Sequence, residues 1–398
     1  MITGFTDRDR EFMKRAISLA EKGRGCTSPN PMVGAVIVKN DRIISKGYHR
    51  RAGGDHAEID AINNSPIAVK DSTIYVSLEP CSVTGKTPPC TDELIKKGFR
   101  KVIIGAIDPN PQVKGTGIKK LKEAGIEVLS GLFENEIKKQ NEVFFKHIQE
   151  KMPFVCAKTA SSIDGKLATA TSDSKWITCL SSRNTVQDLR REYGCVLTGI
   201  NTVLADDPTL FPKNDLTSPE DFNLKHFMDG DNNIFTRVIL DSHLKIPLDS
   251  RIVRTAGKIK TIIFASYRTA NKDISAEKES LLRKASVNIE YSNSKRWDPE
   301  EVLKFLYDKY NIVSVMLEAG PAILTSFLRS MLIDKFKIFI APKIIGGDSS
   351  FDMFGKMSVN KIKDSIKLEF DSFNKSGDDI LITAYPANNT GGVRCLLE

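Results

Sequence analysis

The sequence predicts an α/β protein of two domains. Three observations lead to this prediction: the chain has 398 residues, hydrophobic and charged residues make up 40% and 27% of it, and short apolar runs alternate with amphipathic stretches. A domain has roughly 150 residues, so this length allows two or three domains. The composition is average for soluble globular proteins and excludes collagen-like, low-complexity and mostly disordered chains. The alternation is typical of a layered α/β fold.

The first 150 residues alternate predicted helices and strands. Apolar residues recur on one helical face in residues 7–22, which predicts a helix there. Gly98 and Gly125 suit the ends of two later helices, because glycine readily adopts the left-handed conformation found there. Helices are expected at 57–63, at 91–97 and 118–124, which end at these two glycines, and at 134–151, which is one long polar helix. Buried strands are expected at the short apolar runs 33–38, 43–48, 73–78 and 101–106.

We place the domain boundary near Pro153, so that the first domain spans 1–150 and the second spans 151–398. The second half alternates in the same way. Residues 213–236 are polar, rich in Asp and Asn and nearly patternless, and we interpret them as an inserted surface loop. Strands are expected at 154–158, 196–198, 237–241, 260–265, 314–317, 337–340 and 380–384.

The chain carries a net charge of +8, from 58 basic and 50 acidic residues. This modest excess permits a phosphorylated or nucleic-acid partner but requires neither. No apolar run approaches the roughly 18 residues that span a bilayer, and the N-terminus has no signal-peptide core, so a cytoplasmic protein is expected. Seven cysteines without a secretion signal favour metal binding or free thiols over disulfides.

A candidate metal site lies in the first half. His56 stands where a loop enters a helix, Cys81 follows a strand, and Cys90 comes after a further eight residues. One imidazole and two thiolates suit Zn²⁺, and three protein ligands leave a fourth position for water, as in catalytic sites. Glu58 is placed to move a proton from water to a leaving amine, as in zinc nucleobase deaminases. Ordinary buried residues or a structural zinc site are the alternatives, although no fourth ligand is found nearby.

The first half resembles the riboflavin-biosynthesis pyrimidine deaminases, which have a cytidine-deaminase-like α/β/α fold. The matching segments are 27–35, 47–49, 56–58, 78–81, 87–90 and 108–111. The resemblance implies one Zn²⁺ per chain, held by His56, Cys81 and Cys90, with Glu58 as the catalytic proton shuttle. It also places the substrate's base, ribose or phosphate against Asn30, His49, Lys86, Asp108 and Asn110.

Polar turns follow three predicted strands of the second half, at residues 160–166, 199–207 and 318–321. Helix N-termini at such turns bind phosphates through free backbone amides, and Pro321 suits the first position of a helix. The turns therefore suggest a nucleotide cleft, although the dinucleotide fingerprint G-x-G-x-x-G is missing from this sequence. From the residues alone, ordinary strand-to-helix turns explain them equally well.

This half resembles the reductase of the same pathway, which has a dihydrofolate-reductase-like α/β fold. The matching segments are 158–160, 162–166, 174–178, 189–191, 202–208, 240–242, 317–318, 320–321, 341–343 and 346–347. The resemblance implies that NADPH lies along Ala160, Trp176, Thr202, Asp206, Ser242, Gly320, Pro321, Ala322, Ile323, Leu324, Thr325 and Ser326. It places the substrate against Ser174, Arg190, Leu210, Lys213 and Glu318, with Lys158 and Glu318 as the charged catalytic pair beside the sugar.

Together these features predict a bifunctional enzyme of riboflavin biosynthesis. The first domain is expected to deaminate a diaminopyrimidinone ribosylamine phosphate with zinc, and the second to reduce the ribosyl side chain to ribityl with NADPH. The expected partner is this phosphorylated pyrimidine substrate, with no nucleic acid and no membrane. The resemblance further implies a homo-oligomer, either a dimer or a tetramer.

Two other functions are compatible with parts of this pattern. A nucleic-acid deaminase of the tRNA-adenosine type would share the zinc ligands and use the positive charge, but the cysteine spacing and the second half argue against it. A zinc-stabilised binding module with a degenerate reductase is the other alternative. Glu58 beside His56 argues against that module, because a structural zinc site does not need it.

Overall fold

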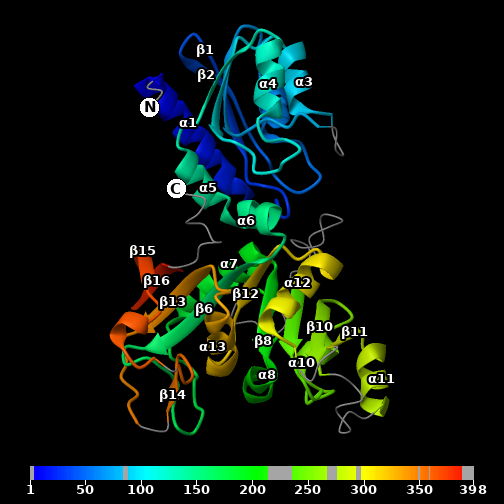
Figure 1. The fold of residues 1–398 in the computed structure, drawn as a ribbon, viewed down its shortest axis with the longest axis vertical. Coiled ribbons are helices and arrows are strands. Elements are labelled where there is room, and N and C mark those ends of the chain that lie inside the picture. The colour runs from blue at the N-terminus through cyan, green and yellow to red at the C-terminus, as the bar shows by residue number, and fades with distance from the viewer. Residues whose placement is uncertain are drawn as a thin grey trace. The chain divides into compact units, whose positions relative to one another are not determined.

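The computed structural model describes residues 4–83, 88–213, 235–266, 276–292, 297–347, 350–357 and 359–387 (Figure 1). Within them, the residues up to Lys151 form one compact unit and the residues from Met152 onward form a second. Among the helices described, none is both long and apolar enough to cross a membrane. Each unit is built around its own sheet.

The first unit begins with a helix and contains five described strands. Its strands are β1 (Gly34–Lys39), β2 (Arg42–Tyr48), β3 (Thr73–Leu78), β4 (Lys101–Ala106) and β5 (Glu127–Ser130). Its helices are α1 (Asp7–Ala20), η1 (Glu21–Gly23, a 3-10 turn), α2 (Ala57–Asn63), α3 (Cys90–Lys96), α4 (Thr116–Glu123), α5 (Glu134–Gln140) and α6 (Glu142–Glu150). The strand order is β2-β1-β3-β4-β5, with β1 antiparallel to its neighbours and β3, β4 and β5 parallel.

Alternate residues of these strands face two separate hydrophobic cores. Ala35 and Ile37 of β1 pack with apolar residues of α2, α3 and α4, whereas Val36 and Val38 pack with those of α1, α5 and α6. Successive side chains of a strand point to opposite faces of its sheet. The sheet is therefore covered by helices on both faces, which is the predicted α/β/α arrangement (Figure 1).

The second unit is a larger mixed sheet with helices around it. Its strands are β6 (Phe154–Ser162), β7 (Lys166–Ala168), β8 (Cys195–Gly199), β9 (Thr236–Leu240), β10 (Lys260–Ala265), β11 (Val287–Tyr291), β12 (Ser314–Leu317), β13 (Lys335–Ala341), β14 (Phe351–Asp352), β15 (Leu368–Ser376) and β16 (Asp379–Pro386). Its helices are α7 (Leu180–Tyr193), α8 (Ile200–Asp206), α10 (Arg251–Arg254), α11 (Ala276–Lys284), α12 (Pro299–Tyr310), α13 (Pro321–Arg329) and η3 (Ile362–Asp364).

Nine of the described strands form one sheet in the order β11-β10-β9-β8-β12-β6-β13-β16-β15. The strands from β11 to β13 are parallel, and β16 and β15 are antiparallel. Strands β14 and β7 pair separately. Because parallel strands end at the same edge of a sheet, the carboxyl ends of β6, β12 and β8 meet there.

Several sequence-based predictions about the elements are wrong. The single helix predicted over 134–151 is two helices, because Asn141 leaves helical geometry between them at φ −106° and ψ 27°. Strand β6 continues to Ser162, so residues 160–162 lie in a strand and only the residues after them turn. Strands β5, β7, β11, β14 and β15 were not predicted.

The missed strands lack the uniform apolar run that predicts a buried strand. Strand β15 is exposed along most of its length, because it lies at the edge of the sheet. Its backbone pairs with β16, so hydrogen bonding to a neighbour forms the strand rather than side-chain burial. Of the predicted inserted loop 213–236, residues 214–234 lie outside the described residues.

Candidate functional site

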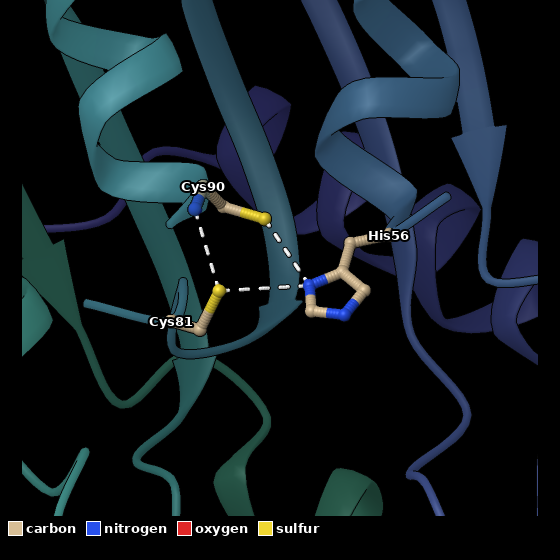
Figure 2. A group of neighbouring side chains, drawn as sticks. All are labelled: His56, Cys81 and Cys90. Atoms are coloured by element: carbon tan, nitrogen blue, oxygen red, sulfur yellow. Dashed lines mark hydrogen bonds between the residues drawn. The ribbon is translucent and has the colours of Figure 1, made fainter. Parts of the chain in front are cut away.

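Three potential metal ligands converge between β3, α2 and α3 (Figure 2). His56 is the residue before α2, Cys81 follows β3, and Cys90 is the first residue of α3. The Nδ1 atom of His56 lies 3.2 Å from the Sγ atom of Cys90 and 3.6 Å from that of Cys81. Among the described residues, this is the only such group of three or more potential ligands.

These distances fit a tetrahedral zinc ion. Typical Zn–N and Zn–S bonds place a nitrogen and a sulfur ligand about 3.6 Å apart and two sulfur ligands about 3.8 Å apart. The three donor atoms here all lie within 4.8 Å of one another. One imidazole and two thiolates with no fourth protein ligand in the described part of the chain match an open, catalytic type of site.

Glu58 lies in the first turn of α2, and its side chain is buried. Burial raises the pKa of Glu58 to about 7, although the nearby His56 opposes this rise. A hydrogen bond from Cys90 lowers the pKa of Cys81, and His56 lowers it further. The cluster therefore favours a thiolate at Cys81 and places a carboxyl group that can exchange protons beside it.

Close backbone contacts set the position of this site. A Cβ atom on Gly47 of β2 would lie 2.2 Å from the backbone nitrogen of Ala61, so glycine lets α2 pack directly on the strand. A Cβ atom on Gly117 of α4 would lie 2.3 Å from the carbonyl oxygen of Pro80, next to Cys81. Both glycines thus permit ligand-bearing segments to approach neighbouring elements.

Glu79, two residues before Cys81, lies in the matching segment 78–81 but has no predicted role. Its buried carboxylate accepts hydrogen bonds from the backbone nitrogens of Gly115 (3.0 Å), Gly117 (3.1 Å) and Ile118 (3.2 Å). It thereby fixes the start of α4 next to the cysteine loop. An acidic residue directly after a strand that was predicted to be buried was the available signal.

Of the predicted substrate contacts in this domain, His49 lies beside the potential metal ligand His56, and Asn30 contacts His49. His49 is buried, its ring centroid is 5.5 Å from that of His56, and its Nε2 atom lies 3.2 Å from the Nδ2 atom of Asn30. Asp108 is buried, accepts from the backbone nitrogen of Asn110 at 2.8 Å, and its pKa is raised to about 6 by burial. Lys86 lies outside the described residues.

In the second unit, three predicted charged residues form one cluster, in which Glu318 is buried and the two cations are half-buried. Glu318 follows β12, and its carboxylate lies 3.0 Å from the Nζ atom of Lys158 on β6 and 2.6 Å from the Nε atom of Arg190 on α7. A second nitrogen of Arg190 donates to the other carboxylate oxygen at 3.0 Å, which makes the pair bidentate. Burial alone would raise the pKa of Glu318, but Arg190 and Lys158 together lower it to about 2.

The predicted cofactor turn follows the same strand. Gly320 caps α13, Pro321 is its first residue as predicted, and a Cβ atom on Gly320 would meet no atom within 4 Å. A Cβ atom on Gly199, at the end of β8, would lie 2.3 Å from the side chain of Ile323. An open helix N-terminus beside a close strand-to-helix contact suits the phosphates of a dinucleotide.

Other predicted reductase residues lie on separate elements of this unit. Trp176 is 61% exposed, and the guanidinium of Arg183 lies 4.0 Å from its ring centroid. Asp206 ends α8 and pairs with Lys175 at 3.4 Å. Thr202 lies on α8, Ala160 on β6, and Ser174 and Ser242 in loops, whereas the rest of the predicted turn, 322–326, lies on α13.

The two remaining predicted contacts precede the part of the chain that is not described. The side chain of Leu210 is buried, and its backbone has a positive φ of 55°. The backbone nitrogen of Lys213 donates to the side-chain oxygen of Gln187 at 3.1 Å. The same oxygen accepts from Arg190 at 3.4 Å, so Gln187, which was not predicted, connects Lys213 with the charged cluster.

Comparisons with known proteins cover nearly the whole chain. The family model for the RibD C-terminal domain matches residues 153–382, and that for the cytidine and deoxycytidylate deaminase zinc-binding region matches residues 6–106. The chain is 38% identical to riboflavin biosynthesis protein RibD of Actinobacillus pleuropneumoniae over 377 residues, 95% of each chain. It is 39% identical to RibD of Aquifex aeolicus over 374 residues, 94% of this chain and 97% of the relative.

Solved structures agree with these matches. RibD of Acinetobacter baumannii superposes with a TM-score of 0.81 at 34% identity, covering 96% of this chain and 99% of the other. A diaminohydroxyphosphoribosylaminopyrimidine deaminase/5-amino-6-(5-phosphoribosylamino)uracil reductase from Thermotoga maritima gives 0.79 at 35% identity, with the same coverage. The predicted fold class and bifunctional activity are thus confirmed, and neither alternative function accounts for both halves. The chain belongs to the RibD family and is a bifunctional enzyme of riboflavin biosynthesis, with a deaminase domain followed by a reductase domain.

Proposed function

We propose that the first domain hydrolyses 2,5-diamino-6-(5-phosphoribosylamino)pyrimidin-4(3H)-one to 5-amino-6-(5-phosphoribosylamino)uracil and ammonia. The observation that carries this proposal is the convergence of His56, Cys81 and Cys90 beside the buried carboxyl group of Glu58. His56, Cys81 and Cys90 would hold one Zn²⁺ per chain. When bound, Zn²⁺ supplies Lewis acidity, which makes water a nucleophile near neutral pH.

The protein's own residues account for the proton transfers. A water oxygen adds to the ring carbon that carries the amine, and the Glu58 carboxylate takes a proton from that water. Glu58 then passes this proton to the amine nitrogen, so that ammonia leaves. The proton that remains on the added oxygen moves to the neighbouring ring nitrogen, which leaves a carbonyl. His49 and Asn30, next to the zinc ligands, would orient the pyrimidine, with Asp108, Asn110 and Lys86 as further contacts.

The second domain would then reduce the ribosyl side chain of this uracil to ribityl. NADPH, when bound, supplies the hydride for the open-chain imine carbon, and the imine nitrogen would take a proton from water. Gly320, Pro321 and the following residues of α13 would face its phosphates, together with Ala160, Trp176, Thr202, Asp206 and Ser242. Lys158 and Glu318 would hold the sugar, with Arg190, Ser174, Leu210 and Lys213 around the rest of the substrate. Buried charges at fixed positions orient the imine and limit its motion.

The proposed division of labour is tested with one variant and two readouts. Glu58→Gln is expected to retain zinc, measured by elemental analysis, and to lose ammonia release, because the carboxamide cannot exchange the proton. NADPH oxidation should be unchanged when the variant is given the deaminated uracil. Full ammonia release by Glu58→Gln would refute the mechanism.

The reductase assignment and the assembly have separate tests. NADPH should be oxidised faster than NADH with the deaminated uracil as substrate, and equal rates would contradict the cofactor choice. The chain is proposed to act in the cytoplasm as a homo-oligomer, a dimer or a tetramer. Light scattering after size exclusion would measure this, and a monomeric mass would contradict it.

A further inference from the structure

The segment 27–33 leads into β1 and carries Asn30 toward the zinc ligands. It forms a turn in which the backbone nitrogen of Asn30 donates to the carbonyl of Thr27 at 2.8 Å. The backbone nitrogen of His49 donates to the carbonyl of Val33 at 2.9 Å, which continues the pairing of the first two strands. This pairing fixes the C-terminal end of the segment to the sheet.

Asn141, between α5 and α6, holds the middle of the segment. Its Oδ1 atom accepts from the backbone nitrogen of Met32 at 2.7 Å, and its Nδ2 atom donates to the carbonyl of Met32 at 3.0 Å. Asn141 is 2% exposed, so water cannot replace either bond. The carboxamide of Asn141 offers a donor and an acceptor side by side, so it makes both bonds to Met32 at once.

His147, two turns further along α6, holds the start of the segment. Its Nε2 atom lies 3.1 Å from the carbonyl oxygen of Pro29, and because a carbonyl only accepts, Nε2 is the donor. The His147 ring is buried and packs edge-on against Phe144, with ring centroids 5.6 Å apart. Asn141, at the N-cap of α6, and His147 within α6 thus bind the backbone on both sides of Asn30.

On its other side, Asn30 reaches the proposed active site through His49. The Nδ1 atom of His49 lies 2.9 Å from the carbonyl oxygen of Asp55, so Nδ1 carries the proton of the neutral ring. Its Nε2 atom therefore accepts from the Asn30 amide at 3.2 Å. His56 comes directly after Asp55, and its ring meets that of His49.

We propose that Asn141 and His147 are positioning residues of the deaminase: they clamp the segment 29–32 so that Asn30 and His49 hold the substrate at the correct distance from the zinc ligands. This inference rests on the proposed deaminase function. Both residues act through the backbone of Pro29 and Met32.

The test uses the zinc-loaded full chain and two variants. His147→Phe keeps a ring to pack against Phe144 but removes the donor, and Asn141→Ala removes both bonds to Met32. For each, we expect the KM for deamination to rise about tenfold, the equivalent of one hydrogen bond of about 1.4 kcal/mol. Zinc content and NADPH oxidation with the deaminated uracil should equal those of the unaltered enzyme.

Two controls separate positioning from stability. His147→Gln restores a nitrogen donor at nearly the same place and is expected to restore the KM. Gln140→Ala removes two bonds of the neighbouring helix end, to the carbonyl of Ile17 (3.0 Å) and to Glu21 (2.7 Å), without touching the segment 29–32. It should leave the KM unchanged. A smaller folded fraction would lower apparent kcat and leave KM unaltered, so a rise in KM reports the clamp.

Three outcomes would overturn the inference. The first is an unchanged KM in both His147→Phe and Asn141→Ala, with normal ammonia release by the unaltered enzyme. The second is an equal rise of KM in Gln140→Ala. The third is a loss of zinc from His147→Phe and Asn141→Ala that is large enough to explain their rise in KM. If the unaltered enzyme released no ammonia from the diaminopyrimidinone, the proposed function itself would fail, and the inference with it.

Discussion

Replacing Glu318 with glutamine should destabilise the second unit and change how its stability depends on pH. The Glu318 carboxylate is 9% exposed and is contacted by two cations, Lys158 at 3.0 Å and Arg190 at 2.6 Å. Glutamine keeps the shape of the side chain but removes the charge. Both cations would then be partly buried without an anion beside them. Removing one partner of a buried ion pair lowers the free energy of unfolding strongly, because the remaining charge is left uncompensated.

The size of the effect follows from the pKa of Glu318, which is about 2 in the folded protein against an ordinary value of 4.5. At about 1.4 kcal/mol per pKa unit, this difference corresponds to about 3 kcal/mol at pH 7. Removing one partner of a buried pair typically costs about 3 to 5 kcal/mol, which agrees. Because the folded pKa is lowered, this stabilisation is present above pH 4.5 and is lost as the pH falls toward 2. About 1.4 kcal/mol of it remains at pH 3.

Tryptophan fluorescence during urea unfolding provides the assay. The chain has two tryptophans, Trp176 and Trp297, and both lie in the second unit. The free energy of unfolding of Glu318→Gln should be about 3 kcal/mol below that of the unaltered protein at pH 7, and this gap should narrow by about 2 kcal/mol at pH 3. Asp352→Asn is the control. It removes an ion pair with Lys166 in which the Asp352 side chain is 67% exposed, so the free energy of unfolding should fall by less than about 1 kcal/mol. A loss below about 1 kcal/mol for Glu318→Gln, or a gap independent of pH, would refute the reasoning.

Three further changes test other parts of the structure. Gly47→Ala should displace α2, because the new Cβ would lie 2.2 Å from the backbone nitrogen of Ala61. We expect its free energy of unfolding to fall by about 1 to 3 kcal/mol, measured by circular dichroism melting, and its zinc retention to weaken, measured by metal analysis. Arg237→Met should cost more than about 3 kcal/mol in the fluorescence assay, since this fully buried guanidinium donates to the carbonyls of Thr209 (3.1 Å) and Ile252 (2.9 Å). Chelation of zinc should abolish ammonia release and leave NADPH oxidation intact, and parallel loss of both would contradict separate sites.

Strands with uniform burial were the most predictable part of the fold. The predicted bounds of β3, β4, β10 and β12 are those observed, because each strand is covered on both faces and therefore carries a continuous apolar run. Edge strands could not be predicted in this way. In β15 the residues Phe370 and Phe373 are 60% and 62% exposed, so burial imposes no pattern on it.

The residue types and order of His56, Cys81 and Cys90 indicated a metal site, because metal binding depends on particular side chains. The reductase turns had no such signal of their own and were predicted from the resemblance to a known family. The three predicted metal ligands converge, and Lys158, Arg190 and Glu318 form one cluster. That Arg190 would meet Glu318, 128 positions away, follows only from the placement of α7 over the end of β12.

The sequence by itself determined the two-domain α/β architecture, the buried strands and the residue types that make a zinc site. Tertiary structure alone decided how those residues are supported: Glu79 binds backbone amides of α4, and Asn141 binds the backbone of Met32, which is 109 positions away. The physical reason is that these supports have a backbone group as one partner. Every residue carries the same N–H and C=O groups, so no pattern of side chains indicates which of them a distant polar side chain will bind.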